Sequence, residues 1–303
     1  MDENRKKGLR IQSVSARVSQ TVIVIILLIF SLIILFPLFN VIMTSLTGQA
    51  EYARHGAFIM IPEEWDFTAY KLILGAGSNI WNGYKNTIFV VVVGTAFNMF
   101  VTVPMAYALS KKHLRGRKTI LAMILITMMF TGGMIPDYLL VNYLGLIDSR
   151  WALILPTLVS AWNMIILRNF FYTIPESLEE SAMLDGASRL QVLVRIIIPL
   201  SMPAIATISL WYAVAHWNSW FTAVLYINNN KMLPVQNILR NILITTSAFA
   251  DLDPSAWSEL MTPPSSFMMR SATIVVSTLP ILAAYPFVQK YFVKGVMVGS
   301  IKG

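Results

Sequence analysis

Residues 20–45 contain no Asp, Glu, Lys or Arg, and this run limits the possible folds more than any other feature of the sequence. A helix needs about 20 largely apolar residues to cross the hydrocarbon core of a bilayer. The run therefore predicts a transmembrane helix. Five later runs with few charges meet the same requirement, and the six predicted spans are residues 20–45, 85–109, 119–142, 151–172, 196–226 and 271–292.

The composition agrees with a membrane protein, because 56% of the 303 residues are hydrophobic and soluble chains carry fewer. The predicted fold class is all-α: a polytopic membrane protein with six transmembrane helices. A basic segment precedes the first span, as in a secretory signal peptide. The apolar run is too long for a signal peptide and no small-residue cleavage site follows it, so we expect the span to be retained.

The basic residues predict the orientation of the chain in the membrane. Segments on alternate sides of the predicted spans differ: residues 1–19, 111–118, 168–195 and 290–302 are rich in Lys and Arg, whereas the segments between them mix fewer basic residues with acids. Cytoplasmic loops carry the excess of Lys and Arg, so we expect both termini in the cytoplasm. The net charge of +8 therefore reports orientation, and no nucleic-acid partner is expected.

The spans divide the chain into segments that differ in exposure. We expect a cytoplasmic amino terminus (1–19), the first transmembrane helix (20–45), an external loop (46–84), a core membrane domain (85–294) and a cytoplasmic carboxyl-terminal tail (295–303). The core includes a cytoplasmic loop (173–195) and an external loop (227–270). Both external loops are too polar to span and should form short surface helices, which either meet an external partner or cap the bundle.

The sequence carries no recognisable set of catalytic or metal-binding residues. It has no Cys, and its three His, at positions 55, 113 and 216, are far apart in the chain, so we expect neither a metal site nor a bound cofactor. No phosphate-binding loop of the form G-x-x-x-x-G-K-[ST] and no nucleophile elbow occurs. We therefore expect that the protein is not an enzyme and does not itself hydrolyse ATP.

Glycine and proline interrupt several predicted spans. The stretch FTGGMIP places Gly132, Gly133 and Pro136 within the third span, and such residues weaken or remove intrahelical hydrogen bonds. Non-helical backbone at membrane depth is tolerated where it packs against protein or lines water. The breaks indicate either a pathway or moving gate, or the ordinary kinks of membrane helices. Four more prolines raise the same question: Pro104, Pro156, Pro203 and Pro280.

The densest aromatic cluster, WYAVAHWNSWF, lies near the external end of the fifth span. Its rings and hydrogen-bonding groups suit contacts with a sugar inside a pore. Trp and Tyr also form belts at membrane interfaces, so both interpretations stay open. The residues concerned are Trp211, Tyr212, His216, Trp217 and Asn218.

The cytoplasmic loop between the fourth and fifth spans contains the polar stretch TIPESLEESAMLDGASRLQ. A Ser or Thr followed three residues later by Glu or Gln is typical of a capping box at a helix start. Thr173 with Glu176 therefore predicts one helix. Ser188 with Gln191 predicts a second, and Gly186 permits the turn between them. Such a helical corner either docks in a groove of another protein and moves as a lever, or is a solvated loop.

The stretch EESAMLDGASRLQVLVRIIIP resembles the signature of the membrane subunits of ABC importers: Glu-Ala-Ala, three residues, Gly, nine residues, Ile, one residue, Leu-Pro. Ser181 replaces one Ala, and Ile198 replaces the Leu. The resemblance implies that this loop is the coupling helix that docks on a separate ATPase. The coupling residues that it implies are Glu179, Glu180, Ser181, Ala182, Leu184, Asp185 and Gly186.

Three more stretches, FTGGMIPDYLLVNYLGLIDSRWALILP, HWNSWF and YFVKGVMVGSIKG, narrow the resemblance. They are similar to MetI-like, type I carbohydrate permeases of the maltose-permease type, in the subgroup for complex oligosaccharides. This implies a homologous second permease, an ATPase dimer that binds ATP and Mg, and an external solute-binding protein, in the bacterial cytoplasmic (inner) membrane. It implies that Lys302 and Gly303 reach between the ATPase subunits, and it favours oligosaccharides with uronic acids, such as pectin, alginate or aldouronate fragments.

Three alternatives stand beside an oligosaccharide importer. A permease of this family for another solute class would share the same motifs. An ion-coupled secondary transporter usually carries charged residues at mid-membrane, and the one candidate in the predicted spans is Asp137, beside the break at Pro136. A structural membrane scaffold would need neither an ATPase nor a substrate.

Overall fold

The computed structural model describes residues 14–56, 58–75, 78–250 and 266–300. In these ranges the regular structure is helical, with one isolated bridge between Thr47 and Trp65, so the predicted all-α fold is confirmed for them. The chain divides into two compact units. The first comprises Met1–Tyr70 and Asp253–Val275, and the second comprises Lys71–Leu252 and Val276–Gly303.

The first unit begins with α1 (Val14–Ser45), followed by α2 (Gln49–His55). The large apolar side chains of α1 are exposed from Val18 to Leu38, as expected of a helix whose surroundings are lipid. A hydrogen bond holds the loop after α2 to that helix. The backbone N–H of Glu63 donates to the buried Glu51 carboxylate of α2 at 2.9 Å. The short helix α3 (Thr68–Leu74) follows this loop.

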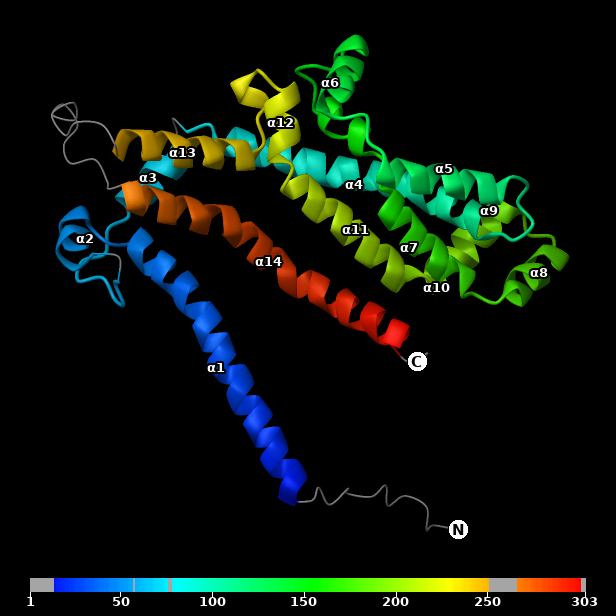
Figure 1. Cartoon of the computed structure of the whole chain (residues 1–303), viewed down its shortest axis with the longest axis horizontal. Coiled ribbons are helices and arrows are strands. Elements are labelled where there is room, and N and C mark those ends of the chain that lie inside the picture. Colours follow the sequence, from blue (N-terminus) through cyan, green and yellow to red (C-terminus); the bar gives the residue numbers. More distant parts are fainter. Residues whose placement is uncertain (1–13, 57, 76–77, 251–265, 301–303) are drawn as a thin grey trace. The chain divides into compact units, whose positions relative to one another are not determined.

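The second unit is organised along one long helix, α4 (Ile80–Ser110), and α7 and α11 pack along it (Figure 1). The helices after α4 are α5 (Arg117–Met129), α6 (Met134–Tyr143), α7 (Ala161–Tyr172), α8 (Glu176–Leu184), α9 (Arg189–Val192), α10 (Ile198–Leu200), α11 (Met202–Trp217), α12 (Trp220–Tyr226) and α13 (Val235–Ala250). Short 3-10 turns (Arg150–Leu153, Leu155–Thr157 and Asn230–Met232) and a π-helical turn (Leu193–Ile197) join some of them, and α14 (Ser266–Ser300) ends the described chain.

The core of the second unit lies where α4, α7 and α11 meet. Apolar side chains from all three helices interlock there, and each is at most 7% exposed. In lipid, such helices are held together by close packing and interhelical hydrogen bonds, because lipid tails are as apolar as the buried side chains. The core residues of these helices are Val103, Ala106, Leu109, Met164, Leu167, Phe171, Ile208 and Tyr212.

The predicted spans differ in how continuous they are. Within the described residues, Val18–Ser45 and Ile80–Ser110 are each long and apolar enough to cross a membrane. Three other candidates are bent pairs of helices: α5 with α6 at 113°, the turns at Arg150–Thr157 with α7 at 51°, and Arg189–Leu200 with α11 at 85°. Phe267–Ala283 is a shorter apolar helix. Apolar composition therefore located these segments without revealing their bends.

The prolines act less uniformly than the sequence suggested. Pro156 and Pro203 lie at the bends before α7 and α11, whereas Pro104 and Pro280 lie inside uninterrupted helices. Pro104 and Pro280 therefore do not break their helices. The turn between α5 and α6 is made by glycine, because Gly133 has φ +88°. Pro136 falls in the first turn of α6, where its missing N–H costs little.

Some expectations fall partly or wholly on residues outside the described ranges. α2 and α3 lie in the segment 46–84 and α13 occupies much of the segment 227–270, the two segments predicted to be external. Residues 251–265 of the latter segment are outside the described residues. So are Lys302 and Gly303, for which the resemblance implies a contact with an ATPase.

Candidate functional site

The polar loop at residues 173–195, which the sequence predicts to be cytoplasmic, folds as a short helix, a corner and a second helix. α8 begins at Glu176, but its N-cap is Pro175, which offers no side-chain hydrogen bond. Thr173 instead ends α7, and its hydroxyl donates to the Phe170 carbonyl at 2.8 Å. The predicted capping box at Thr173 is therefore wrong, because α7 extends to Tyr172 and uses the threonine at its own end.

The corner and the second helix agree with the sequence. Asp185 ends α8, and Gly186 adopts φ +87°, a left-handed conformation that glycine reaches without a steric penalty. The capping box of α9 is confirmed. The Ser188 backbone N–H donates to Oε1 of Gln191 at 2.7 Å, and the Gln191 N–H donates to Oγ of Ser188 at 3.3 Å.

The residues implied as ATPase contacts do not share one environment. Most of them are exposed on α8 or at its end: Glu180, Ser181, Leu184, Asp185 and Gly186. Ala182 is half-buried beside the core. Glu179 is buried, with its side chain 8% exposed, so it faces the rest of this chain.

Tyr107 of α4 and Lys111, the C-cap of α4, bind the buried carboxylate of Glu179. Its Oε1 pairs with Nζ of Lys111, and its Oε2 accepts a hydrogen bond from the Tyr107 hydroxyl at 3.2 Å. The Lys111 ammonium also lies 4.3 Å from the Tyr107 ring centroid, a favourable cation–π distance. Sequence reasoning missed both residues. Their spacing of four along a helix, next to a basic loop, was the available signal.

Basic side chains surround Tyr172 near the same end of α4. Lys112, Arg117 and Arg168 each lie 5.5–5.7 Å from the Tyr172 ring centroid. Nε of Arg117 and Nε of Arg168 both donate to the Leu109 carbonyl, at 3.0 and 3.1 Å. Cations at a helix carboxyl end compensate its partial negative charge. These residues therefore fix the end of α4 against α7.

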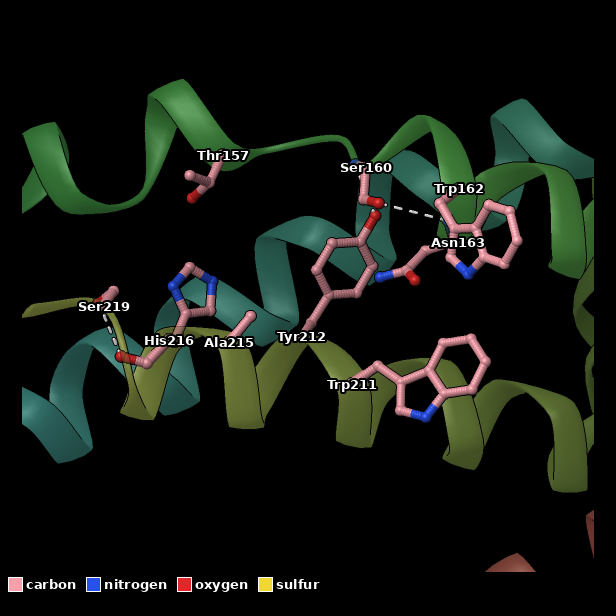
Figure 2. A pocket seen from close by; sticks show the side chains of 9 residues that line it. All are labelled: Thr157, Ser160, Trp162, Asn163, Trp211, Tyr212, Ala215, His216 and Ser219. Atoms are coloured by element: carbon pink, nitrogen blue, oxygen red, sulfur yellow. Dashed lines mark hydrogen bonds between the residues drawn. The ribbon is translucent and has the colours of Figure 1, made fainter. Parts of the chain in front are cut away.

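A cavity of about 440 Å³ opens between α11 and the chain leading into α7. Figure 2 shows side chains of α11 facing the opposite segment across this space. The lining residues are Thr157, Ser160, Trp162, Asn163, Trp211, Tyr212, Ala215, His216 and Ser219. The lining combines two indoles with small hydroxyl and amide groups, and it contains no Lys, Arg, Asp or Glu.

Hydrogen bonds to α4 fix one wall of the cavity. The Tyr212 hydroxyl lies 2.9 Å from Oγ1 of Thr102, and it accepts the Ser160 backbone N–H at 2.9 Å. Nε2 of His216 lies 2.7 Å from Oδ1 of Asn98. The Asn98 amide nitrogen donates to the Thr157 carbonyl at 2.8 Å, so its oxygen is the acceptor and Nε2 of His216 carries the proton.

Close helix packing makes this arrangement possible. A side chain at Gly94 of α4 would place its Cβ 2.6 Å from Nε2 of His216, which is shorter than a van der Waals contact. Glycine at this position therefore lets the imidazole approach the α4 backbone and reach Asn98.

The structure brings together only part of the predicted pathway set. Trp211, Tyr212 and His216 line the cavity, whereas Trp217 and Asn218 do not. The Trp217 indole N–H is buried without a hydrogen-bond partner, and the exposed Asn218 side chain donates to the Val214 carbonyl at 3.0 Å. Gly132, Gly133 and Pro136 lie at the bend between α5 and α6, outside the lining.

The opposite wall was missed by sequence reasoning. Ser160, Trp162 and Asn163 stand at the start of α7, where Ser160 is the N-cap and its hydroxyl accepts the Asn163 N–H at 3.3 Å. The available signal was an aromatic and an amide residue directly after a proline-containing break. Among the residues that the structure describes, no group of three or more His, Asp or Glu is placed to hold a metal ion.

Comparison with known proteins identifies the family. The family model of the binding-protein-dependent transport system inner membrane component matches residues 83–298. The polygalacturonan/rhamnogalacturonan transport system permease protein YtcP of Bacillus subtilis (strain 168) is 46% identical over 277 residues, which cover 91% of this chain and 96% of that protein. Protein LplC of the same organism is 43% identical over 271 residues, which cover 89% and 90%.

A solved structure extends the similarity to three dimensions. A chain in the crystal structure of a bacterial ABC transporter involved in the import of the acidic polysaccharide alginate is 36% identical, with a TM-score of 0.81. The match covers 92% of this chain and 98% of that chain. Permease subunits of such transporters are not catalytic, because ATP is hydrolysed by a separate ATPase subunit. This chain belongs to the family of binding-protein-dependent transport system inner membrane components.

Proposed function

We propose that this chain forms half of the translocation pathway of an ATP-driven oligosaccharide importer in the bacterial cytoplasmic membrane. It would cross the membrane six times, with both termini in the cytoplasm. Its partners would be a homologous second permease, two ATPase subunits that bind ATP and Mg, and an external solute-binding protein. Its family, the carbohydrate transport named for its relatives and the excess of Lys and Arg on one side support this proposal.

The observation that carries the sugar assignment is the cavity beside α11. Indole faces pack against the apolar C–H faces of a sugar ring, while amide and hydroxyl groups hydrogen-bond to its hydroxyls. Trp162 and Trp211 supply two such faces, and Asn163 supplies an amide at the same place. We assign this cavity to the passing sugar, with Tyr212 and His216 as its floor and the bend at Gly132, Gly133 and Pro136 as the candidate gate.

The relatives favour acidic sugars as the substrate class. YtcP is named for polygalacturonan and rhamnogalacturonan, and the solved relative imports alginate. The cavity lining contains no Lys or Arg that would pair with a uronate carboxylate. We therefore assign recognition of ring faces and hydroxyls to this chain, and selection of the carboxylates to the external binding protein.

The proposed mechanism is alternating access driven by the ATPase. The exposed residues of α8 and of the corner that follows it would dock on the ATPase dimer, namely Glu180, Ser181, Leu184, Asp185 and Gly186. Lys302 and Gly303 would reach between the ATPase subunits. Closure of the dimer on ATP would move α8 and re-pack the bent helices. Only contacts that differ between nucleotide states shift such an equilibrium, so docking contacts on α8 must change during the cycle.

The central test uses the four-part complex in proteoliposomes, with its binding protein and oligogalacturonides prepared from polygalacturonan. We expect uptake that requires ATP and the loaded binding protein. In that system Trp211→Ala and Trp162→Ala should each lower uptake by about threefold to tenfold, the value of one aromatic contact. Trp81→Ala is the matched control, because Trp81 is exposed at the start of α4 and away from the cavity.

Two outcomes would overturn the proposal. Uptake driven by an ion gradient without any ATPase would indicate a secondary transporter. Equal uptake by the Trp162, Trp211 and Trp81 variants would remove the cavity from the pathway.

A further inference from the structure

Glu179 is the only residue of α8 that the fold buries. Its neighbours Leu178 and Glu180 are exposed, and so is Leu184 at the end of the helix. A carboxylate is expensive to bury unless it is paired and hydrogen-bonded. A chain that needed α8 only as a solvated docking helix would have no reason to bury a charge there.

Both oxygens of the Glu179 carboxylate are bound by α4. Lys111 and Tyr107 provide the contacts, and the Lys111 side chain is itself only 27% exposed. The next lysine makes a longer and more exposed ion pair with α8. Lys112 lies 3.8 Å from Glu176, and both side chains of that pair are about half exposed. Exposed pairs contribute little to stability, so the attachment of α8 to α4 depends on Glu179 and Lys111.

α4 also supports one wall of the cavity. Asn98 and Thr102 hydrogen-bond to His216 and Tyr212, and α4 continues without interruption from these residues to its C-cap at Lys111. At a rise of about 1.5 Å per residue, the distance along the helix axis between positions 98 and 111 is about 20 Å. The carboxyl end of α4 therefore contacts α8, and its residues Asn98 and Thr102 contact the cavity wall.

We infer that Glu179 and Lys111 form an internal tie that makes α8 and α4 move as one body. The tie delivers the displacement of α8 to the cavity through Asn98 and Thr102. Glu179 is then a positioning residue within this chain, and docking on the ATPase falls to the exposed face that begins at Glu180. This inference rests on the proposed function, because it requires an ATPase that moves α8.

The absence of Cys from the sequence allows a direct test. Ala215→Cys places one thiol on an exposed residue of the cavity lining. In the purified complex, its rate of labelling by a maleimide is compared without nucleotide and after trapping with ATP and vanadate. Labelling is read on this chain alone, and no sugar is needed.

We expect trapping to change the labelling rate in the Ala215→Cys background, and Lys111→Gln or Glu179→Gln to reduce that change about fivefold or more, in the range of ordinary allosteric couplings. Lys112→Gln is the matched control and should leave the change intact. The exchange Lys111→Glu with Glu179→Lys should restore it, which separates a specific pairing from general damage to the fold.

A second measurement covers the case in which the single variants do not assemble. Lys111→Cys and Glu179→Cys are joined in a chain without the reporter by a short bis-methanethiosulfonate reagent, which forms a disulfide with each thiol and releases methanesulfinate. ATP hydrolysis is then measured. A joined pair that keeps nucleotide-driven activity supports the inference, because α8 then need not move against α4. Loss of activity on joining, or a full labelling change in Lys111→Gln, would overturn it. No change on trapping even in the Ala215→Cys background would instead contradict the proposed function.

Discussion

Gly186 makes the corner after α8 in a conformation that ordinary side chains avoid, with φ +87°. A Cβ at this position would meet nothing within 4 Å, so a substitution is penalised by the backbone and not by crowding. Gly186→Val should strain the corner by about 1–3 kcal/mol and reduce ATP-driven uptake. Asn tolerates the left-handed region, so Gly186→Asn should retain most of the uptake. Equal uptake by the two variants would contradict this role of the corner.

Asp148 joins two loops of the second unit. Its carboxylate accepts the backbone N–H groups of Asn229 at 2.9 Å and Asn228 at 2.5 Å. These hydrogen bonds lower the pKa of Asp148 below its usual 3.8. Because the folded pKa lies below the unfolded one, the carboxylate stabilises the fold above the unfolded pKa. That stability is lost as the pH falls through the folded pKa.

Asp148→Asn tests this pH dependence without disturbing the backbone, since Asp148 has φ +58° and Asn is also common in that region. We expect the variant to unfold at a lower temperature than the parent at pH 7. The difference should shrink as the pH falls below 3.8 and the parent carboxylate becomes protonated. Thermal unfolding of the detergent-solubilised protein at a series of pH values measures this. A difference that does not change with pH would show that charge is not the cause.

The helices around the α8 corner show what local sequence determines and what it does not. Ser188 and Gln191 cap α9 as their spacing predicts, because both partners lie within one turn. The same pattern at Thr173 does not cap α8. Leu167 and Phe171 pack in the core, so α7 continues to Tyr172 and Thr173 becomes its C-cap. The burial of Glu179 could not be predicted from the neighbouring sequence either, since its partner Lys111 lies far away in the chain.

This contrast makes a prediction about the two caps. Removing an N-cap hydroxyl costs about 1 kcal/mol, so Ser188→Ala should speed amide hydrogen exchange in α9 by about fivefold. Thr173→Ala should leave exchange at the start of α8 unchanged, because Thr173 does not cap that helix. Hydrogen exchange of the purified complex, read by mass spectrometry of peptides covering 173–195, compares the variants. Faster exchange at the start of α8 in Thr173→Ala would contradict the observed end of α7.

For the whole chain, hydropathy located the apolar segments but not their continuity. Transfer of a run into lipid depends on summed hydrophobicity, which does not report the 113° bend at Gly133 or the 85° bend before α11. For the same reason, only one wall of the cavity could be predicted from the sequence. Trp211 and His216 stood in one conspicuous cluster, whereas Trp162 joined them only through the bend that precedes α7.

The orientation of the chain can be tested with single cysteines in a sequence that has none. Glu64 and Arg115 are both exposed, and among the described residues between them the one candidate span is α4. At about 1.5 Å per residue, its 31 residues extend about 46 Å, more than the roughly 30 Å of the hydrocarbon core. One crossing would place the two positions on opposite sides, and the excess of Lys and Arg predicts that Arg115 lies in the cytoplasm.

In intact cells, a membrane-impermeant maleimide should therefore label Glu64→Cys at once. It should label Arg115→Cys only after the membrane is permeabilised, and a permeant maleimide should label both variants, which controls for accessibility. The reverse pattern would place α8 outside the cell. No ATPase could then reach its exposed face, and the coupling mechanism proposed for this chain would fail with it. Labelling of both positions from outside would instead remove α4 as a span.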